Sequence, residues 1–194
     1  MAKKLIIISG FAGSGKSSLA DSLGKELGIK VIHASSILRE MATDGVKALE
    51  NASPQKLHDW WESSEAKGFM KRRQEDGSLD IALDRKLLEI AKEGNVLMDS
   101  WTMPYLYKGK AFRVWLEASA KVRAQRVSER DGLPFGTVLA KIKARDMETK
   151  ALYQRLYNFN MGKSPTNFDL VVNSDTLLKS EVFEKVLKAI KKWN

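Results

Sequence analysis

The chain has 194 residues, of which 43% are hydrophobic and 29% are charged. This composition is typical of a globular protein, and the length suits a single domain with a core of its own. Because the chain has no cysteine, disulfides and thiolate metal sites are excluded. No apolar run approaches the roughly 18 residues that a membrane-spanning helix needs, and the apolar run after Lys4 is too short for a signal peptide. The sequence therefore predicts no membrane partner.

The formal net charge of +9 suits a polyanionic ligand, either a nucleic acid or a nucleotide that binds in a cleft. The tightest basic clusters are Lys71 to Arg73 and the pair Lys191 and Lys192. Neither accompanies an RNA-binding signature, and such clusters are usually solvated surface. We therefore expect a nucleotide ligand, with nucleic acid as the alternative.

Residues 10–17 follow an apolar run directly and read Gly-Phe-Ala-Gly-Ser-Gly-Lys-Ser. This is the phosphate-binding loop pattern G-x-x-x-x-G-K-[ST] at every defined position. The glycines let the backbone N–H groups curl toward an anion, and the helix that follows adds its positive N-terminal dipole. Lys16 can then reach the β- and γ-phosphates of a nucleoside triphosphate, while the Ser17 hydroxyl can bind the Mg²⁺ that bridges them.

The flanking segments agree with this interpretation, because residues 5–9 form a buried strand pattern and residues 16–27 an amphipathic helix pattern. A dinucleotide-binding loop is excluded, since no third glycine follows Gly13 and Gly15. The sequence predicts a site for ATP with Mg²⁺ and, because that chemistry takes place there, a cytoplasmic location. The predicted ATP-binding residues are Gly10, Phe11, Ala12, Gly13, Ser14, Gly15, Lys16, Ser17 and Ser18.

A short strand is predicted over residues 30–33, followed by a helix from Ala34 with a serine available as N-cap. Arg39 lies one turn into this helix, and Ser35 lies at its start, near the carboxyl edge of the sheet where ligands of open α/β sheets bind. A guanidinium there can hold the phosphate of a second nucleotide. The alternative is a surface arginine.

Residues 43–78 form a polar insert that is interrupted by turn-forming residues. We expect a mobile subdomain over the second substrate, with a short helix over residues 55–66. That helix carries Trp60 and Trp61, which would stack a base or, as is more common, pack a helix.

A helix is predicted over residues 79–93, with Asp80, Asp84 and Arg85 in its first half. These residues either face the substrate or lie on an exposed, acidic helix start. The next strand, residues 95–98, is followed by Asp99. An aspartate in this position, downstream of a phosphate loop, commonly holds Mg²⁺; the alternative is a turn or N-cap aspartate.

After a fourth strand over residues 111–117, two helices carry arginines, one over 119–130 and one over 135–157. We expect these helices to form a lid that excludes water from the γ-phosphate and neutralises the charge that develops in transfer. The alternative is a surface of ion pairs with neighbouring acidic residues. The predicted catalytic residues are Lys16, Arg126, Arg130 and Arg145. A fifth strand over 168–173 and a helix over 179–192 complete the pattern.

These segments occur in the order seen in nucleoside monophosphate kinases, and the chain most closely resembles archaeal-type cytidylate kinases. The resemblance covers nearly the whole chain except the insert and rests on the phosphate loop and on residues 33–39, 80–85, 96–99, 113–118, 122–132, 143–146 and 168–174. It implies one α/β, three-layer P-loop kinase domain on a five-stranded parallel sheet. The core would comprise 1–34, 79–118 and 159–194, the acceptor-binding insert 35–78, and the lid region 119–158.

The resemblance also implies that a monomeric enzyme transfers the γ-phosphoryl group of MgATP to CMP or dCMP. In that family, Ser35 and Arg39 would bind the acceptor, with the arginine on its phosphate, and Asp84 and Arg85 would lie near the acceptor nucleotide. The arginines at 126, 130 and 145 would contact the phosphates when the lid closes. The expected metal ligands, Ser17 and Asp99, follow from the loop motif and the strand end and not from the resemblance.

The chain departs from the cytidylate kinase pattern in places. Ser100 and Trp101 stand where an arginine is usual, and Thr149 and Leu152 replace two polar contacts, for which Arg155 is a candidate substitute. The Asp-Ser-Trp stretch also resembles small archaeal and nuclear adenylate kinases. AMP or a small metabolite is therefore an alternative acceptor, and a non-catalytic ATP-binding switch or RNA-associated factor is an alternative function.

Overall fold

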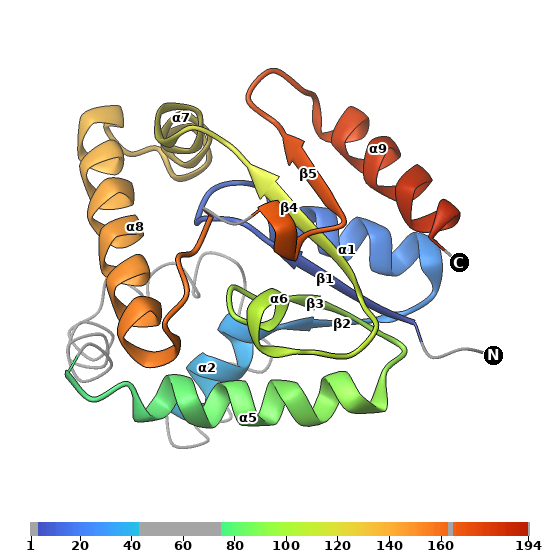
Figure 1. The fold of residues 1–194 in the computed structure, drawn as a ribbon. Helices are drawn as coiled ribbons and strands as arrows, with labels where there is room; N and C mark the ends of the chain where they lie inside the picture. Colours follow the sequence, from blue (N-terminus) through green and yellow to red (C-terminus); the bar gives the residue numbers. More distant parts are fainter. Residues whose placement is uncertain (1–3, 43–74, 163–164, 194) are drawn as a thin grey trace.

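The computed structural model describes residues 4–42, 75–162 and 165–193. Five parallel strands form one sheet in the order β2-β3-β1-β4-β5 (Figure 1). The strands are β1 (Leu5–Ser9), β2 (Lys30–His33), β3 (Val96–Asp99), β4 (Phe112–Glu117) and β5 (Leu170–Asn173). The predicted five-stranded parallel sheet is therefore confirmed.

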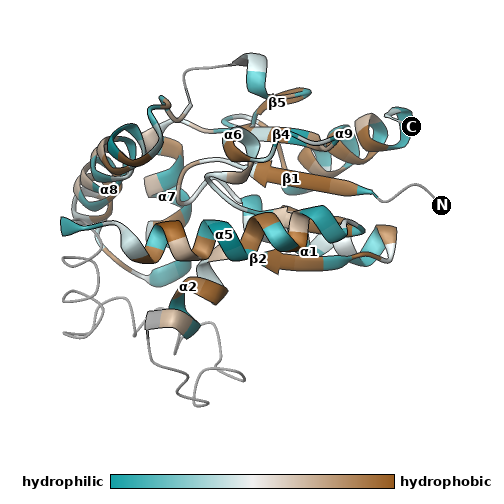
Figure 2. Ribbon diagram, turned by 60° about the horizontal axis from the view of Figure 1, so that its bottom comes forward, coloured by the Kyte–Doolittle hydropathy of each residue, from teal (hydrophilic) through white to brown (hydrophobic). Residues whose placement is uncertain are grey.

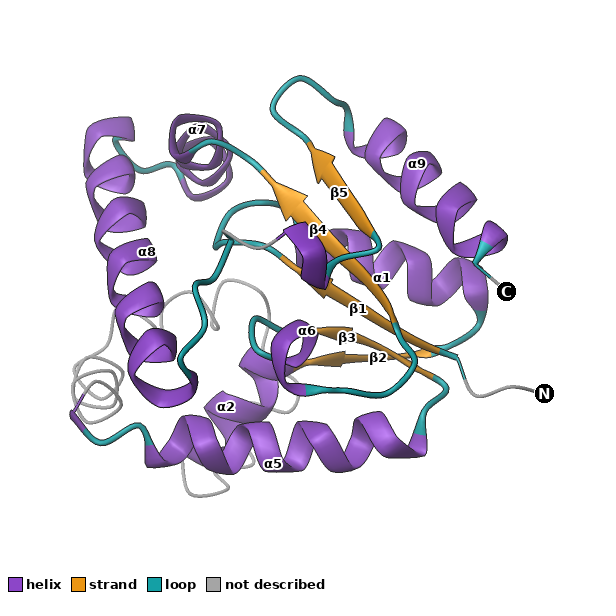
Figure 3. Cartoon of the chain, in the orientation of Figure 1, coloured by secondary structure: helices purple, strands orange, loops and turns teal. Residues whose placement is uncertain are grey.

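Helices cover both faces of the sheet (Figure 3). On one face, Ile6 and Ile8 pack with α1 (Lys16–Leu27) and α9 (Lys179–Lys192). On the other, Leu5 and Ile7 pack with α2 (Ala34–Ala42) and α5 (Ser78–Glu93). Because successive strand side chains point to opposite faces, the central strand must be apolar throughout, and β1 is hydrophobic along its length in Figure 2.

Two further helices, α7 (Ala120–Asp131) and α8 (Phe135–Tyr157), lie beyond the carboxyl ends of the strands and pack against each other through Ala124, Val138 and Ile142 (Figure 1). We call this pair the lid. Two of its basic residues, Arg130 and Arg145, lie near the phosphate loop that follows β1.

Within the described residues, each predicted strand and helix forms, with ends that differ by at most a few residues. The sequence missed α6 (Met103–Leu106), where only a turn was expected, and the short 3-10 helix Pro165–Asn167. Most of the predicted insert over 43–78, including the helix over 55–66 with Trp60 and Trp61, lies outside the described residues. No helix in the described part of the chain is long and apolar enough to cross a membrane.

Candidate active site

The loop between β1 and α1 has a backbone that favours glycine. Gly13 and Gly15 have φ values of 80° and 93°, in the left-handed region where a Cβ causes strain. At Gly10, a Cβ would lie 2.5 Å from the carbonyl oxygen of Leu116, so a side chain there would push the loop away from β4. The loop conformation expected of a phosphate-binding segment is thus built into these three positions.

Asp99, the last residue of β3, contacts the first two residues of α1, Lys16 and Ser17. Its side chain is 4% exposed, its Oδ2 accepts a hydrogen bond of 2.6 Å from Ser17 Oγ, and its Oδ1 lies 3.9 Å from Lys16 Nζ. Burial alone would raise the pKa of Asp99, but Lys16 and the hydrogen bonds from His33 and Ser17 outweigh burial and lower it. The carboxylate is therefore ionised at neutral pH.

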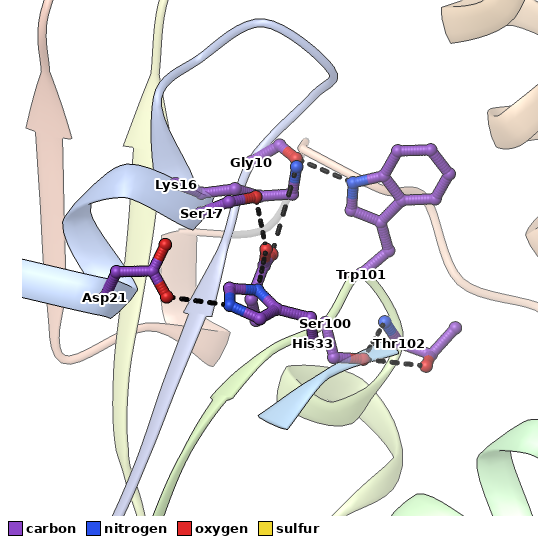
Figure 4. Close-up of polar contacts among 9 residues, drawn as sticks. Gly10, Lys16, Ser17, Asp21, His33, Ser100, Trp101 and Thr102 are labelled. Atoms are coloured by element: carbon purple, nitrogen blue, oxygen red, sulfur yellow. Dashed lines mark hydrogen bonds and ion pairs between the residues drawn. The ribbon is translucent and has the colours of Figure 1, made fainter. Parts of the chain in front are cut away.

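His33 ends β2 and is paired in register with Asp99 on the neighbouring strand. Its Nδ1 lies 3.1 Å from Asp99 Oδ2, and its Nε2 lies 2.9 Å from Asp21 Oδ1 (Figure 4). Both partners are carboxylates, so both bonds form together when both ring nitrogens carry a proton. The hydrogen bond to Asp99 accordingly raises the pKa of His33 above its usual value, against the effect of burial.

Ser17 and Asp99 fit the requirements of a bound Mg²⁺. Both present oxygen atoms, which are the ligands that this ion prefers. Asp99 Oδ1 is also a buried acceptor that has no hydrogen-bond partner among the described residues. The described residues hold no group of three or more acidic or histidine side chains arranged to bind a metal ion, so an all-protein metal cage is not built here. Phosphate and water oxygens would complete the coordination, as is usual for Mg²⁺.

A cavity of 680 Å³ opens beside the phosphate loop, within the size range of small-molecule sites. Its lining includes Ser35 and Arg39 from α2, and Arg130 and Arg145 from the lid. Burial lowers the pKa of the Arg39 guanidinium, as expected for a cation partly removed from water. The predicted site residues that the structure brings to the cavity are Ala12, Gly13, Lys16, Ser17, Ser35, Arg39, Asp99, Arg130 and Arg145.

Other predicted residues lie away from the cavity. Arg126 donates hydrogen bonds to the hydroxyl and the carbonyl oxygen of Ser174, so its guanidinium is directed at the end of β5. Arg85 is exposed on α5, and Ser18 is exposed on α1. Arg155 lies 3.5 Å from the carbonyl oxygen of Glu75 and does not line the cavity.

Asp80 and Asp84 do not form the exposed helix start that was considered as an alternative; their side chains are only 1% and 3% exposed. Asp84 accepts hydrogen bonds from Thr102 and, at 2.6 Å, from the hydroxyl of Tyr157 on α8. Burial and this bond to Asp84 raise the pKa of Tyr157. The two aspartates are buried because the start of α5 packs under the end of α8, a contact between distant segments that periodicity does not reveal.

Trp101 is a cavity residue that sequence reasoning did not select. Its indole N–H donates a hydrogen bond of 2.8 Å to the carbonyl oxygen of Gly10 (Figure 4). Its ring centroid lies 5.7 Å from Lys16 Nζ and 5.6 Å from Arg145 Cζ. The available signal was its place two residues after Asp99, at the carboxyl end of a buried strand.

Arg123 is a second residue whose role was missed. It is 3% exposed and forms two hydrogen bonds with Asp146 on α8, at 3.1 and 2.6 Å. Its Nη1 also donates to the carbonyl oxygen of Ala12 in the phosphate loop, at 3.0 Å. The ion pairs expected as the alternative to a lid are thus present in part, and this one joins the lid helices to the loop.

Comparisons with known proteins agree with this arrangement. The model of the cytidylate kinase-like family matches residues 5–176. The cytidylate kinase of Pyrococcus horikoshii is 30% identical over 188 residues, which cover 97% of this chain and 88% of that protein. The cytidylate kinase of Sulfurisphaera tokodaii is 32% identical over 188 residues, which cover 95% and 93% of the two chains.

Among solved structures, a shikimate kinase from Bacteroides thetaiotaomicron has a TM-score of 0.56 at 15% identity, covering 98% of each chain. A gluconokinase from Sinorhizobium meliloti has a TM-score of 0.56 at 16% identity, covering 98% of this chain and 93% of the other. At these identities the likeness concerns the fold alone, and it confirms the predicted P-loop kinase fold.

Proposed function

Because this chain belongs to the cytidylate kinase-like family, we propose that it transfers the γ-phosphoryl group of ATP to CMP or dCMP. Membership makes the chain a phosphotransferase of the nucleoside monophosphate kinase type. The observation that carries the proposal is the cavity, which is lined both by the phosphate loop and by a second cation, Arg39 of α2. The proposal keeps the cytoplasmic location and the monomeric state that the sequence predicts.

In this mechanism the ATP phosphates lie on the loop between β1 and α1, with Lys16 reaching the β- and γ-phosphates. Ser17 and Asp99 would hold Mg²⁺, which when bound supplies positive charge next to these phosphates. Arg39 binds the acceptor phosphate in the same cavity, so that the attacking oxygen and the γ-phosphate are held in line. No general base is required, because the acceptor phosphate is already ionised.

The lid completes the site by bringing positive charge to the transferred group. Arg130 and Arg145 line the cavity from α7 and α8, and fixed cations at this point stabilise the charge that develops in the transition state. Arg126 enters the proposal only with a closed lid, because its guanidinium is bonded to Ser174 in this structure.

The proposal also specifies the base of the acceptor nucleotide. The relatives' name supports CMP. AMP is the second candidate, favoured by Trp101, which lines the cavity in a stretch that resembles small adenylate kinases. For the non-catalytic alternatives, an ATP-binding switch or an RNA-associated factor, no cavity residue offers comparable support.

The test is phosphoryl transfer from MgATP across CMP, dCMP, UMP, AMP and GMP, measured by a coupled assay. Lys16→Ala should lower turnover by on the order of 10²- to 10³-fold, because a cation aimed at the developing charge is lost. Lys121→Ala, an exposed lysine on α7 that does not line the cavity, is the matched control and should leave turnover unchanged.

Turnover restricted to CMP and dCMP would support the proposal in full. Turnover of AMP alone would move the chain to the second candidate. If no monophosphate is phosphorylated while ATP still binds, the proposed reaction is wrong and a small-metabolite acceptor or a switch takes its place.

A further inference from the structure

We propose that His33 is a positioning residue that orients the carboxylate of Asp99 for the metal, and that Asp21 holds His33 in place. The inference rests on the proposed MgATP site, but it concerns side chains that neither the motif nor the family pattern assigns. It begins from the unequal environments of the two oxygens of Asp99.

One oxygen of Asp99 is tied back into the protein and the other is not. Oδ2 accepts from Ser17 Oγ at 2.6 Å and is bonded to His33 Nδ1 at 3.1 Å. Oδ1 is buried, has no hydrogen-bond partner in the part of the chain that the structure describes, and lies 3.9 Å from Lys16 Nζ, beside the cavity. The two bonds to Oδ2 therefore leave Oδ1 as the oxygen presented to a cation.

His33 is the donor that a metal would not disturb. Ser17 is itself a proposed metal ligand, so its bond to Asp99 must accommodate the coordination of its own oxygen. His33 approaches from β2, where the register places it directly opposite Asp99. Its bond to Oδ2 can thus persist with or without a bound ion.

Asp21 completes a closed set of contacts. Ser17 and Asp21 lie one helical turn apart on the same face of α1. The contacts run from Ser17 to Asp99, from Asp99 to His33, and from His33 back to Asp21 at 2.9 Å (Figure 4). The imidazole ring is therefore held at both nitrogens, which fixes its plane as well as its position.

Such outer partners matter in metal sites, because they orient the ligand before the ion arrives. Losing one typically costs about 10- to 100-fold in metal affinity. Removing His33 should leave the phosphate loop able to bind nucleotide, and it should weaken only the part of the affinity that depends on the metal.

The experiment measures ADP affinity by calorimetry, once in EDTA and once with saturating Mg²⁺, and takes the ratio of the two dissociation constants. With His33→Ala, ADP affinity in EDTA should match the unsubstituted protein, whereas the Mg²⁺-dependent gain should fall by about 10-fold. His33→Asn places an amide donor near the position of Nδ1 and should recover most of the gain. His33→Gln places its donor near the position of Nε2 and should not.

Two further variants test the chain of contacts. In an Asp99→Asn background, His33→Ala should have no additional effect, because its partner is already altered. Asp21→Ala should reduce the gain by less than His33→Ala does, since the bond from His33 to Asp99 remains.

The proposal is overturned if His33→Ala leaves the Mg²⁺-dependent gain intact, or if it weakens ADP binding equally in EDTA and in Mg²⁺. It is also overturned if the unsubstituted protein shows no Mg²⁺-dependent gain. No acceptor is present in this measurement, so a negative result here would not contradict the kinase assignment. Conversely, if no monophosphate were phosphorylated in the coupled assay, the result of this binding experiment would still hold.

Discussion

Trp101 shows how a single side chain can change the chemistry of one wall of the site. An arginine at this position would place a further cation near Lys16 and Arg145, whereas an indole offers the negative face of its ring to both. The ring lies within 6 Å of each of these cations, and its N–H holds the first glycine of the phosphate loop. Trp101 therefore contacts both the loop lysine and the lid arginine.

Substitutions at Trp101 can separate these two contacts. Trp101→Phe keeps an aromatic face but loses the hydrogen bond to Gly10, which should lower kcat/KM for MgATP by about 3- to 10-fold. Trp101→Leu also loses the aromatic face, and we expect a further loss of about threefold. Steady-state kinetics at varied MgATP measures both, and equal losses in the two variants would show that the aromatic face contributes nothing.

At the scale of elements, the lid is joined to the core through one buried arginine, Arg123, and its ion pair with the half-buried Asp146. Arg123 on α7 bonds both to Asp146 on α8 and to the carbonyl oxygen of Ala12 in the phosphate loop. Arg130 lies about two turns further along α7. Its side chain is 67% exposed and pairs with the adjacent Asp131. The same helix thus carries one arginine that holds the structure together and one that lines the cavity.

This difference predicts that substituting Arg123 lowers stability, whereas the same substitution at Arg130 lowers turnover. Arg123→Met should lower the free energy of unfolding by about 2 kcal/mol or more, because it removes the hydrogen bonds that a buried guanidinium donates to Asp146 and to the carbonyl oxygen of Ala12. Arg130→Met should change stability by less than about 1 kcal/mol, as is usual for an exposed pair, while it lowers turnover. Urea unfolding of both variants, together with the coupled assay, tests the assignment; equal losses of stability would contradict it.

Local patterns predicted the elements well. The continuous apolar run of β1 and the glycines that end several helices are signals that depend only on neighbouring residues. They did not predict which lid arginine faces which partner. Arg123, Arg126 and Arg130 lie on similar faces of one helix. In the structure, the first pairs with Asp146, the second with Ser174, and the third lines the cavity. The burial of Asp80 and Asp84 against the end of α8 was hidden for the same reason.

At the scale of the whole molecule, every strand is parallel, so the carboxyl ends of all five meet at one edge. His33, Asp99 and the phosphate loop come together there although they are distant in the sequence. The motif predicted the loop and Asp99 from their positions at strand ends, whereas the pairing of His33 with Asp99 required the strand order. Nothing local to residue 33 specifies that β3 is its neighbour.

The whole-molecule arrangement predicts that donor and acceptor share one continuous cavity. A bisubstrate compound, with adenosine and cytidine joined through a pentaphosphate, should therefore bind more tightly than ATP or CMP alone, by about 100-fold or more, because the second nucleotide binds intramolecularly. Calorimetry gives the three affinities. Arg39→Ala should remove most of the gain and leave the affinity for ATP unchanged, since Arg39 lines the cavity from α2 and is not part of the phosphate loop.

The diadenosine pentaphosphate is the matched ligand, since it differs only in the acceptor base. Tighter binding of the cytidine compound would support CMP as the acceptor, and tighter binding of the diadenosine compound would favour AMP. If neither compound binds more tightly than ATP, the two nucleotides do not occupy this cavity together. In-line transfer across it would then be wrong, whatever the base, because direct transfer requires both phosphates to be bound at the same time.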